Sequence, residues 1–219
     1  MKRQYLGDSR DSFKWDYHHF LVPALGLGEL QVVWMMTPDD GGGDGMTAPE
    51  LFPARPEVLA FCNSLRQSRD PSALAGLPAT TGESYKVRLV GSSEHFVHRD
   101  RDAYFAGIEP APGVIFLDPD NGLEPERSCS EKHVRYGEVD DLVRRMPADS
   151  VISVFQHFRR KPFPDDFARI RERLRSGYAT AIYWHSLMFV AITKTESVRK
   201  RVLDANRAYA AGKPVEVLD

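Results

Sequence analysis

The sequence contains little that would place the chain in a membrane or an oxidising compartment. It has only two cysteines, Cys62 and Cys129, and their positions show no metal-ligand spacing. No apolar run approaches the roughly 18 residues that span a bilayer, and no apolar signal region follows Met1. We therefore expect a cytoplasmic protein with reduced thiols and no membrane association.

An excess of charge of either sign is also missing. The 29 Lys and Arg residues nearly balance the 31 Asp and Glu residues, which gives a formal net charge of -2. Such a chain has no general attraction to a polyanion, so any contact with nucleic acid must come from a local patch. Its 219 residues and 42% hydrophobic content are typical of a globular protein. We expect a single α/β domain over residues 1–219.

Several motifs of cofactor-dependent and metal-dependent enzymes are absent. The sequence has no GxxxxGK[ST] loop, no GxSxG turn, no HExxH and no CxxC pair. The glycine run at residues 41–43 is flanked by Asp39, Asp40 and Asp44, which repel a phosphate unless a cation intervenes. These carboxylates suit a sugar hydroxyl, an amino group or a metal better. The sequence therefore favours chemistry by carboxylates, without a cofactor or a resident metal.

Short apolar runs alternate with helical patterns along the chain. Runs of strand length cover Gln31–Met36, Tyr85–Val90, Val114–Leu117, Val151–Phe155 and Ala179–Trp184. Helical spacing covers Pro56–Gln67, Gly137–Arg145, Phe163–Arg175 and Glu196–Ala211. This alternation predicts a Rossmann-like, doubly wound, mostly parallel sheet. Because only His185 and Ser186 separate the last run from LMFVAIT, we expect an antiparallel hairpin near the C-terminus.

Polar side chains follow three of the predicted strands. These side chains are Asp39, Asp40 and Asp44 after the first strand, Asp118, Asp120, Asn121 and Glu124 after the third, and Gln156, His157, Arg159 and Arg160 after the fourth. Each group alone is an ordinary turn or surface loop. Ligands of open α/β sheets bind outside the carboxyl ends of the strands, so the whole set predicts one shared site.

The stretch YLGDSRDSFKW near the N-terminus predicts a capped helix. Asp8 or Asp11 can serve as the N-cap, and residues 13, 17, 20 and 21 form an apolar face. Lys14 lies on another face, where we expect it to meet a phosphate or a carboxylate. Trp15 is a candidate for stacking on a base.

Cleavage of an N-glycosidic bond uses such a set of residues. Asp118 or Asp120 would stabilise the positively charged sugar and orient water, and Asn121, Gln156 or His157 would donate hydrogen bonds to the departing base. A basic strip would hold the backbone of DNA, with members Lys14, Arg159, Arg160 and Lys161. Base flipping costs a few kcal/mol and is easiest for a modified or mispaired base.

Three alternatives remain open. LDPDNG resembles the DPPY-type motif of S-adenosylmethionine-dependent amino-methyltransferases, and the helix with Lys14 is similar to the GNxxDxxKH start of a ribosomal RNA adenine methyltransferase family. An acid at Asp120 departs from that motif. A metal-dependent nuclease would hold Mg²⁺ through carboxylates such as Asp39, Asp44 and Glu124. A catalytically silent nucleic-acid-binding module is the third alternative.

The chain as a whole resembles a widespread, largely uncharacterised bacterial family with the motifs GDxxDxxK and FLDPDNGLE and a strand that ends in QHF. The matching segments are YLGDSRDSFKW, VVWMMTPDDGGGDG, FLDPDNGLEP, KHVRYGEV and SVFQHFRR. That resemblance implies an antiphage DNA glycosylase that removes glucosylated cytosine from phage DNA. Our preferred expectation is therefore a DNA glycosylase that excises a modified base, with modified phage DNA as its partner.

Overall fold

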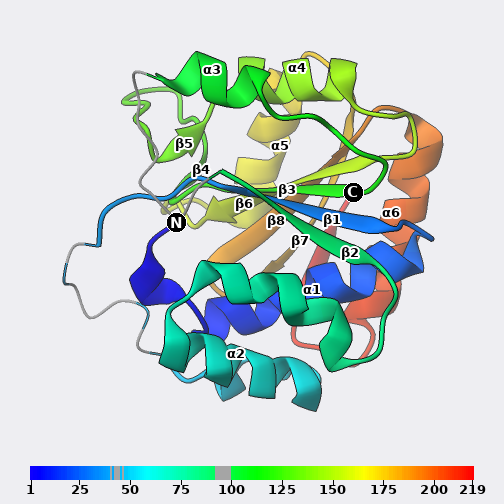
Figure 1. The fold of residues 1–219 in the computed structure, drawn as a ribbon. Helices are drawn as coiled ribbons and strands as arrows, with labels where there is room; N and C mark the ends of the chain where they lie inside the picture. The colour runs from blue at the N-terminus through cyan, green and yellow to red at the C-terminus, as the bar shows by residue number, and fades with distance from the viewer. Residues whose placement is uncertain (40, 42–44, 46, 92–99) are drawn as a thin grey trace.

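The computed structural model describes the whole chain except residues 40, 42–44, 46 and 92–99. The described residues form a seven-stranded sheet with the order β2-β1-β3-β6-β8-β7-β9 (Figure 1). The strands are β1 Glu29–Trp34, β2 Lys86–Val90, β3 Val114–Asp118, β6 Val151–His157, β7 Tyr178–Trp184, β8 Leu187–Thr193 and β9 Glu216–Leu218. Strands β2, β1, β3 and β6 are mutually parallel, and β8 lies antiparallel between β6 and β7. The expected α/β sheet with a C-terminal hairpin is confirmed.

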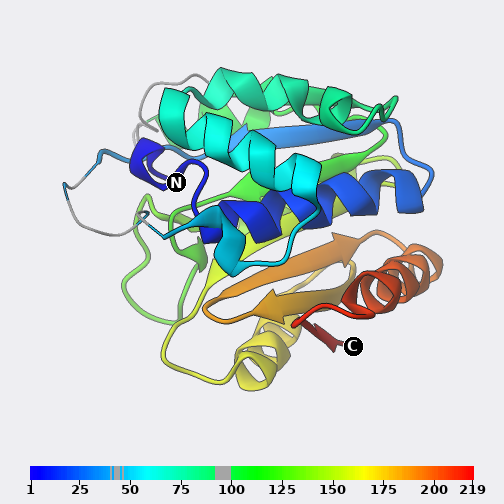
Figure 2. The ribbon, with the colours of Figure 1, turned by 90° about the horizontal axis from the view of Figure 1, so that it is seen from below.

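Helices cover both faces of this sheet (Figures 1 and 2). On one side lie α1 Ser9–Ala24, α2 Pro56–Ser68 and α6 Glu196–Ala210, and on the other lie α3 Arg101–Ala106, α4 Tyr136–Arg145 and α5 Phe163–Arg173. Short 3-10 helices cover η1 Arg3–Tyr5, η2 Pro49–Leu51 and η3 Pro71–Thr80. Of the helices that the structure describes, none is long and apolar enough to cross a membrane.

The apolar strands divide their side chains between two cores. Val32 and Phe116 pack with the α1 side, whereas Val33 and Ile115 pack with the α4 side. Successive side chains of a strand point to opposite faces, and helices cover both faces here. This arrangement explains why the strands are continuous apolar runs in the sequence, without a polar alternation.

Helix α1 is buried more completely than its apolar pattern predicts. It lies against the sheet and is covered by α2 and α6. As a result its polar residues Lys14, His18 and His19 are all buried. The ammonium group of Lys14 therefore needs partners inside the protein, and the expectation that it meets a carboxylate is confirmed by Asp11 and Asp118.

Two strand ends differ from the sequence prediction. Strand β1 ends at Trp34, because Met35 and Thr37 pair with Met1 through backbone hydrogen bonds of 2.7 and 2.8 Å. Strand β6 continues to His157, which pairs with Leu187 of β8. The structure also contains elements without a clear apolar pattern, namely α3, β9 and the two-stranded sheet of β4 Gly122–Leu123 and β5 His133–Val134.

Candidate active site

A buried lysine lies between two buried aspartates at the carboxyl end of β3. The Nζ atom of Lys14 is 2.9 Å from Asp11 and 3.1 Å from Asp118, and all three side chains are at most 4% exposed. Burial opposes the positive charge of Lys14, but the attraction of both carboxylates outweighs it and raises the pKa of Lys14 above its ordinary value. Burial also raises the pKa of Asp118, although Lys14 pulls it in the opposite direction. Lys14 is therefore a fixed ammonium ion.

The GDxxDxxK motif builds this cluster. Gly7 has a φ of +76°, and a Cβ atom there would lie 2.1 Å from the backbone oxygen of Cys62, so only glycine fits against α2. Asp8 is the N-cap of α1 and accepts hydrogen bonds of 2.9 Å from the backbone N–H groups of Arg10 and Asp11. Because Asp11 and Lys14 are three residues apart on the helix, they share one face.

Asp8 carries the most clearly perturbed carboxyl group of this cluster. Burial and the neighbouring charge of Asp11 raise the pKa of Asp8 to about 6, although its hydrogen bond from the backbone of Asp11 acts in the opposite direction. A carboxyl group with this pKa exchanges its proton near neutral pH. Asp8 can therefore act as a general acid or base.

A cavity of about 240 Å³ opens onto this cluster, and we call it the Asp118 cavity. It is lined by Met1, Lys2, Tyr5, Asp8, Arg10, Asp11, Lys14, Asp118, Pro119, Asp120, Asn121, Lys132, Phe155 and His157. Four carboxylates and four cationic side chains line it, so it suits a polar ligand with both hydrogen-bond donors and acceptors. The aromatic ring of Phe155 lies 5.4 Å from Nζ of Lys14 and adds an apolar wall.

The turn after β3 is held by Gln156. Its Oε1 accepts a hydrogen bond of 2.9 Å from the N–H of Leu123, and its Nε2 donates one of 3.1 Å to the oxygen of His157. Gly122 has a φ of +112°, and a Cβ atom there would lie 2.3 Å from Oε1 of Gln156. DPDNG thus requires glycine at its last position for the backbone to approach Gln156.

The structure brings together six of the residues that the sequence singled out. Asp8, Lys14, Asp118, Asp120, Asn121 and His157 all line the Asp118 cavity. Asp120 is 7% exposed and lies 3.7 Å from Nζ of Lys132, a partner that the sequence pattern did not indicate. The shared site at the strand ends is therefore formed mainly by the β3 turn, the end of β6 and the start of α1.

Other predicted site residues lie elsewhere. Trp15 is fully buried between Trp34 and Phe116, so the prediction that it stacks on a base is wrong. The amide of Gln156 is occupied by the backbone and does not face a ligand. Glu124 anchors the start of α4, where its Oε1 accepts a hydrogen bond of 3.0 Å from the N–H of Tyr136.

The remaining predicted residues lie around these elements. Asp39 is exposed and accepts a 3.3 Å hydrogen bond from the N–H of Gln4, whereas Asp40 and Asp44 fall outside the described residues. Arg159 is paired with Asp166 away from the Asp118 cavity, and Arg160 is exposed at the corner between β6 and α5. The basic strip is therefore separate from Lys14.

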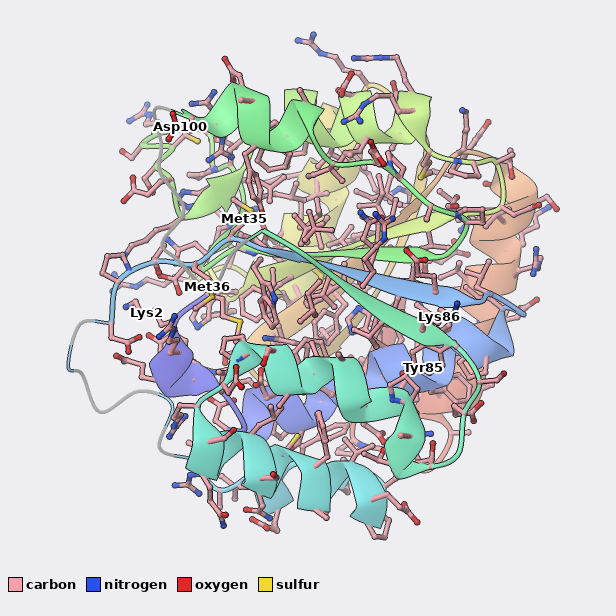
Figure 3. The ribbon with its side chains drawn as sticks, in the orientation of Figure 1. Lys2, Met35, Met36, Tyr85, Lys86 and Asp100 are labelled. Atoms are coloured by element: carbon pink, nitrogen blue, oxygen red, sulfur yellow. The ribbon has the colours of Figure 1, made fainter. Side chains whose placement is uncertain are left out.

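Sequence reasoning missed other lining residues, among them Lys2, Tyr5, Arg10 and Lys132. Lys2 and Tyr5 reach the cavity because residues 1–5 run beside the end of β1, where Figure 3 shows Lys2 near Met35 and Met36. No periodic pattern marks this contact. Asp11, by contrast, could have been found, because its spacing to Lys14 puts a carboxylate and an ammonium group on one helical face.

Comparisons with known proteins place the chain in no family. No family model matches it, and no curated protein matches it. Among solved structures, it is similar to human methyltransferase-like protein 13 in complex with SAH, with 15% identity, a TM-score of 0.39, and coverage of 92% of this chain and 88% of that chain. The chain has a Rossmann-like α/β fold. Among the residues that the structure describes, no group of three or more His, Cys, Asp or Glu side chains could hold a metal ion.

Proposed function

We propose that the chain is an enzyme that methylates the exocyclic amino group of a base in a nucleic acid. The observation that carries this proposal is the state of Asp118 at the end of β3. Its Oδ2 pairs with the fixed ammonium of Lys14, while its Oδ1 accepts no hydrogen bond from the described residues. Asp118 therefore offers the cavity one oriented acceptor, which is what an amino group needs.

The charge of Lys14 also argues against a second role for Asp118. An ammonium group 3.1 Å from the carboxylate makes Asp118 a poorer stabiliser of a positively charged sugar, because the two cations would repel. A hydrogen-bond acceptor for a neutral amine is not weakened in this way. The geometry of Asp118 thus supports recognition of an amine better than stabilisation of an oxocarbenium ion.

The position of LDPDNG supports the same chemistry. The motif begins in the last two residues of β3, and β3 lies between β1 and β6. The resemblance to amino-methyltransferases implies both this place and a C-terminal hairpin like that of β7 and β8. Asp120 and Asn121 stand where that motif has proline and an aromatic residue. Phe155, at the end of β6, supplies an aromatic ring in the Asp118 cavity instead.

S-adenosylmethionine would supply an electrophilic methyl group bonded to a positively charged sulfur. The described residues fit its cationic amino group in one respect. Three oxygen atoms surround the amino nitrogen of Met1. They are the backbone oxygen of Met35 at 2.7 Å, the backbone oxygen of Asp118 at 3.5 Å and a carboxylate oxygen of Asp120 at 3.8 Å. Met35, Asp118 and Asp120 would hold the amino group of the cofactor, which would then replace Met1 at these acceptors. This proposal departs from the cofactor-free chemistry expected from the sequence.

Hydrolysis of an N-glycosidic bond is the second candidate, and Asp8 and Asp120 favour it. The raised pKa of Asp8 suits a general acid that protonates a departing base. Asp120, which lies 3.7 Å from Nζ of Lys132, would orient the attacking water. Both groups line the Asp118 cavity. The resemblance to antiphage DNA glycosylases makes modified phage DNA the substrate in this case.

One experiment separates the two chemistries. The protein is incubated with phage DNA that contains modified cytosine, with unmodified DNA and with RNA, each with and without tritiated S-adenosylmethionine. Methyl transfer gives tritium in the polymer only with the cofactor, whereas base excision gives alkali-labile strand breaks without it. Absence of tritium from all three polymers would refute the methyltransferase proposal.

The variant Asp118→Asn sharpens this test. The new carboxamide oxygen would pair with Lys14, so its NH₂ group would face the amino group of the base and repel it. We expect transfer to fall by about 100-fold or more, as for loss of other oriented catalytic hydrogen bonds. Asp165→Asn, an exposed change of the same kind in α5, is the matched control and should retain full activity.

A further inference from the structure

A second hollow, of about 250 Å³, lies beside the segment that leaves β4 and the start of α5. It is lined by Pro125, Glu126, Arg127, Tyr136, Arg159, Lys161, Asp166, Arg169 and Arg173. We call it the Arg127 hollow. Five of its side chains are cationic and two are carboxylates, although the whole chain has a slight negative charge. The hollow is therefore a local concentration of positive charge.

Its two carboxylates neutralise only part of this charge. Asp166 is held by Arg159 through contacts of 2.5 and 3.2 Å. Glu126 is 3.2 Å from Arg169, but these side chains are 67% and 47% exposed, so water competes for the pair and it contributes little. An excess of positive charge remains even when Glu124, which lies 3.7 Å from Arg173, is included.

Two guanidinium groups in the hollow are already oriented. Arg159 donates to the oxygen of Leu123 at 3.1 Å in addition to its pair with Asp166. Arg173 lies 4.2 Å from the ring centre of Tyr136 and donates to the oxygen of Glu124 at 2.9 Å. Guanidinium groups fixed before binding lose little freedom when an anion arrives.

Arg127 and Lys161 complete the hollow with positive charge that the protein does not use. Neither side chain makes an ion pair or hydrogen bond with the residues that the structure describes, and both line the hollow. Oriented guanidinium groups together with unpaired cations fit a phosphate, which carries several acceptor oxygens.

The Arg127 hollow and the Asp118 cavity are lined by neighbouring residues of the same two segments. Asn121 and His157 line the cavity, whereas Pro125 and Arg159 line the hollow. The hydrogen bond from Arg159 to Leu123 ties the two connecting segments together. The segment after β3 and the segment that starts at the end of β6 therefore contribute residues to both the cavity and the hollow.

We infer that the Arg127 hollow binds a phosphodiester group of the nucleic acid whose base enters the Asp118 cavity. This inference rests on the proposed function for the kind of polymer, but its binding step needs neither Asp118 nor a methyl donor. The hollow fixes the position of the strand, and the cavity selects the base.

Binding of a fluorescein-labelled single-stranded DNA oligonucleotide, followed by anisotropy at several salt concentrations, tests this inference. The variant Arg127→Gln/Lys161→Gln removes two charges that have no structural partner. The matched control, Arg144→Gln/Arg207→Gln, removes two charges that are 63% and 61% exposed in α4 and α6. We expect the first variant to bind about tenfold more weakly and to lower the slope of log K against log salt by about 1.4, since each contact to single strands contributes about 0.7.

The outcomes separate the hollow from the chemistry. Weaker binding and a lower slope in the hollow variant, but not in the control, support the inference. If the wild type also shows no methyl transfer and no base release, only the proposed function fails. Equal affinity and slope in the hollow variant, the control and the wild type overturn the inference. An unchanged melting temperature confirms that each variant is folded.

Discussion

Replacement of Lys14 by methionine tests the central ion cluster most directly. Lys14, Asp11 and Asp118 are 4%, 1% and 1% exposed, so methionine would fill the space of the lysine but leave two carboxylates buried without their shared partner. Removal of one partner from a buried pair typically costs about 3–5 kcal/mol. We expect Lys14→Met to lower the free energy of unfolding at pH 7 by this amount, as measured by urea denaturation.

The pH dependence of this loss identifies its cause. Burial already raises the pKa of Asp118, and without the ammonium group this pKa rises further above the unfolded value, so the folded state binds more protons. Stability that is lost at pH 7 should then return in part as the pH falls and the carboxyl groups become neutral. The double variant Lys14→Met/Asp118→Asn should likewise recover part of the loss.

Arg144→Ala is the control for this series. Arg144 and its partner Asp141 are 63% and 45% exposed, so its removal should change stability by less than about 1 kcal/mol. If Lys14→Met were as stable as the wild type at pH 7, or if its loss of stability did not depend on pH, the assignment of Lys14 as the fixed partner of two buried charges would be refuted.

Two further changes test the surroundings of the Asp118 cavity. Asp8→Asn keeps the N-cap but removes a carboxyl group whose pKa is raised from 3.8 to about 6. As the pH rises from about 4 to 6, the free energy of unfolding of the wild type should fall by on the order of 2 kcal/mol, because the folded state resists loss of this proton. The variant should not show this fall. Urea midpoints at pH 4.5 and 7.5 measure this, and equal pH dependence would contradict the pKa argument. Gly122→Ala should cost more than about 2 kcal/mol, because its φ is +112° and its Cβ would lie 2.3 Å from Gln156. Gly137→Ala in α4 meets open space and should stabilise the protein by about 0.5–1 kcal/mol; similar midpoints for the two glycine variants would rule out the steric argument.

Most of the fold could be predicted because its signals are local. The strands that helices cover on both faces are continuous apolar runs, and the helices have three- and four-residue apolar spacing. Strand β9 and helix α3 escaped prediction because they are too short to show a periodic apolar pattern. The end of β1 was misplaced because Met1, far away in the sequence, takes over the hydrogen bonds of Met35 and Thr37.

The candidate site was only partly predictable. The sequence identified Asp118 and Asp120 because a buried strand ends in them, and parallel strands deliver their carboxyl ends to one edge. It assigned Gln156 to a ligand, although the backbone occupies its amide, and it left open whether Lys14 meets a phosphate or a carboxylate. A side chain's partners depend on contacts between distant segments, which a single sequence does not display.

The sequence by itself determined the chain order of the main strands and helices, an N-cap at Asp8 or Asp11 and the acidic turn after β3, because these depend on neighbouring residues and on apolar spacing. Only the tertiary structure decided that Lys14 reaches Asp118 across 104 positions of the chain. That contact makes Lys14 the buried counter-ion of two carboxylates. It also decides which carboxylates at the strand ends remain open to a ligand, because the free energy of a buried charge depends on the partners that folding brings to it.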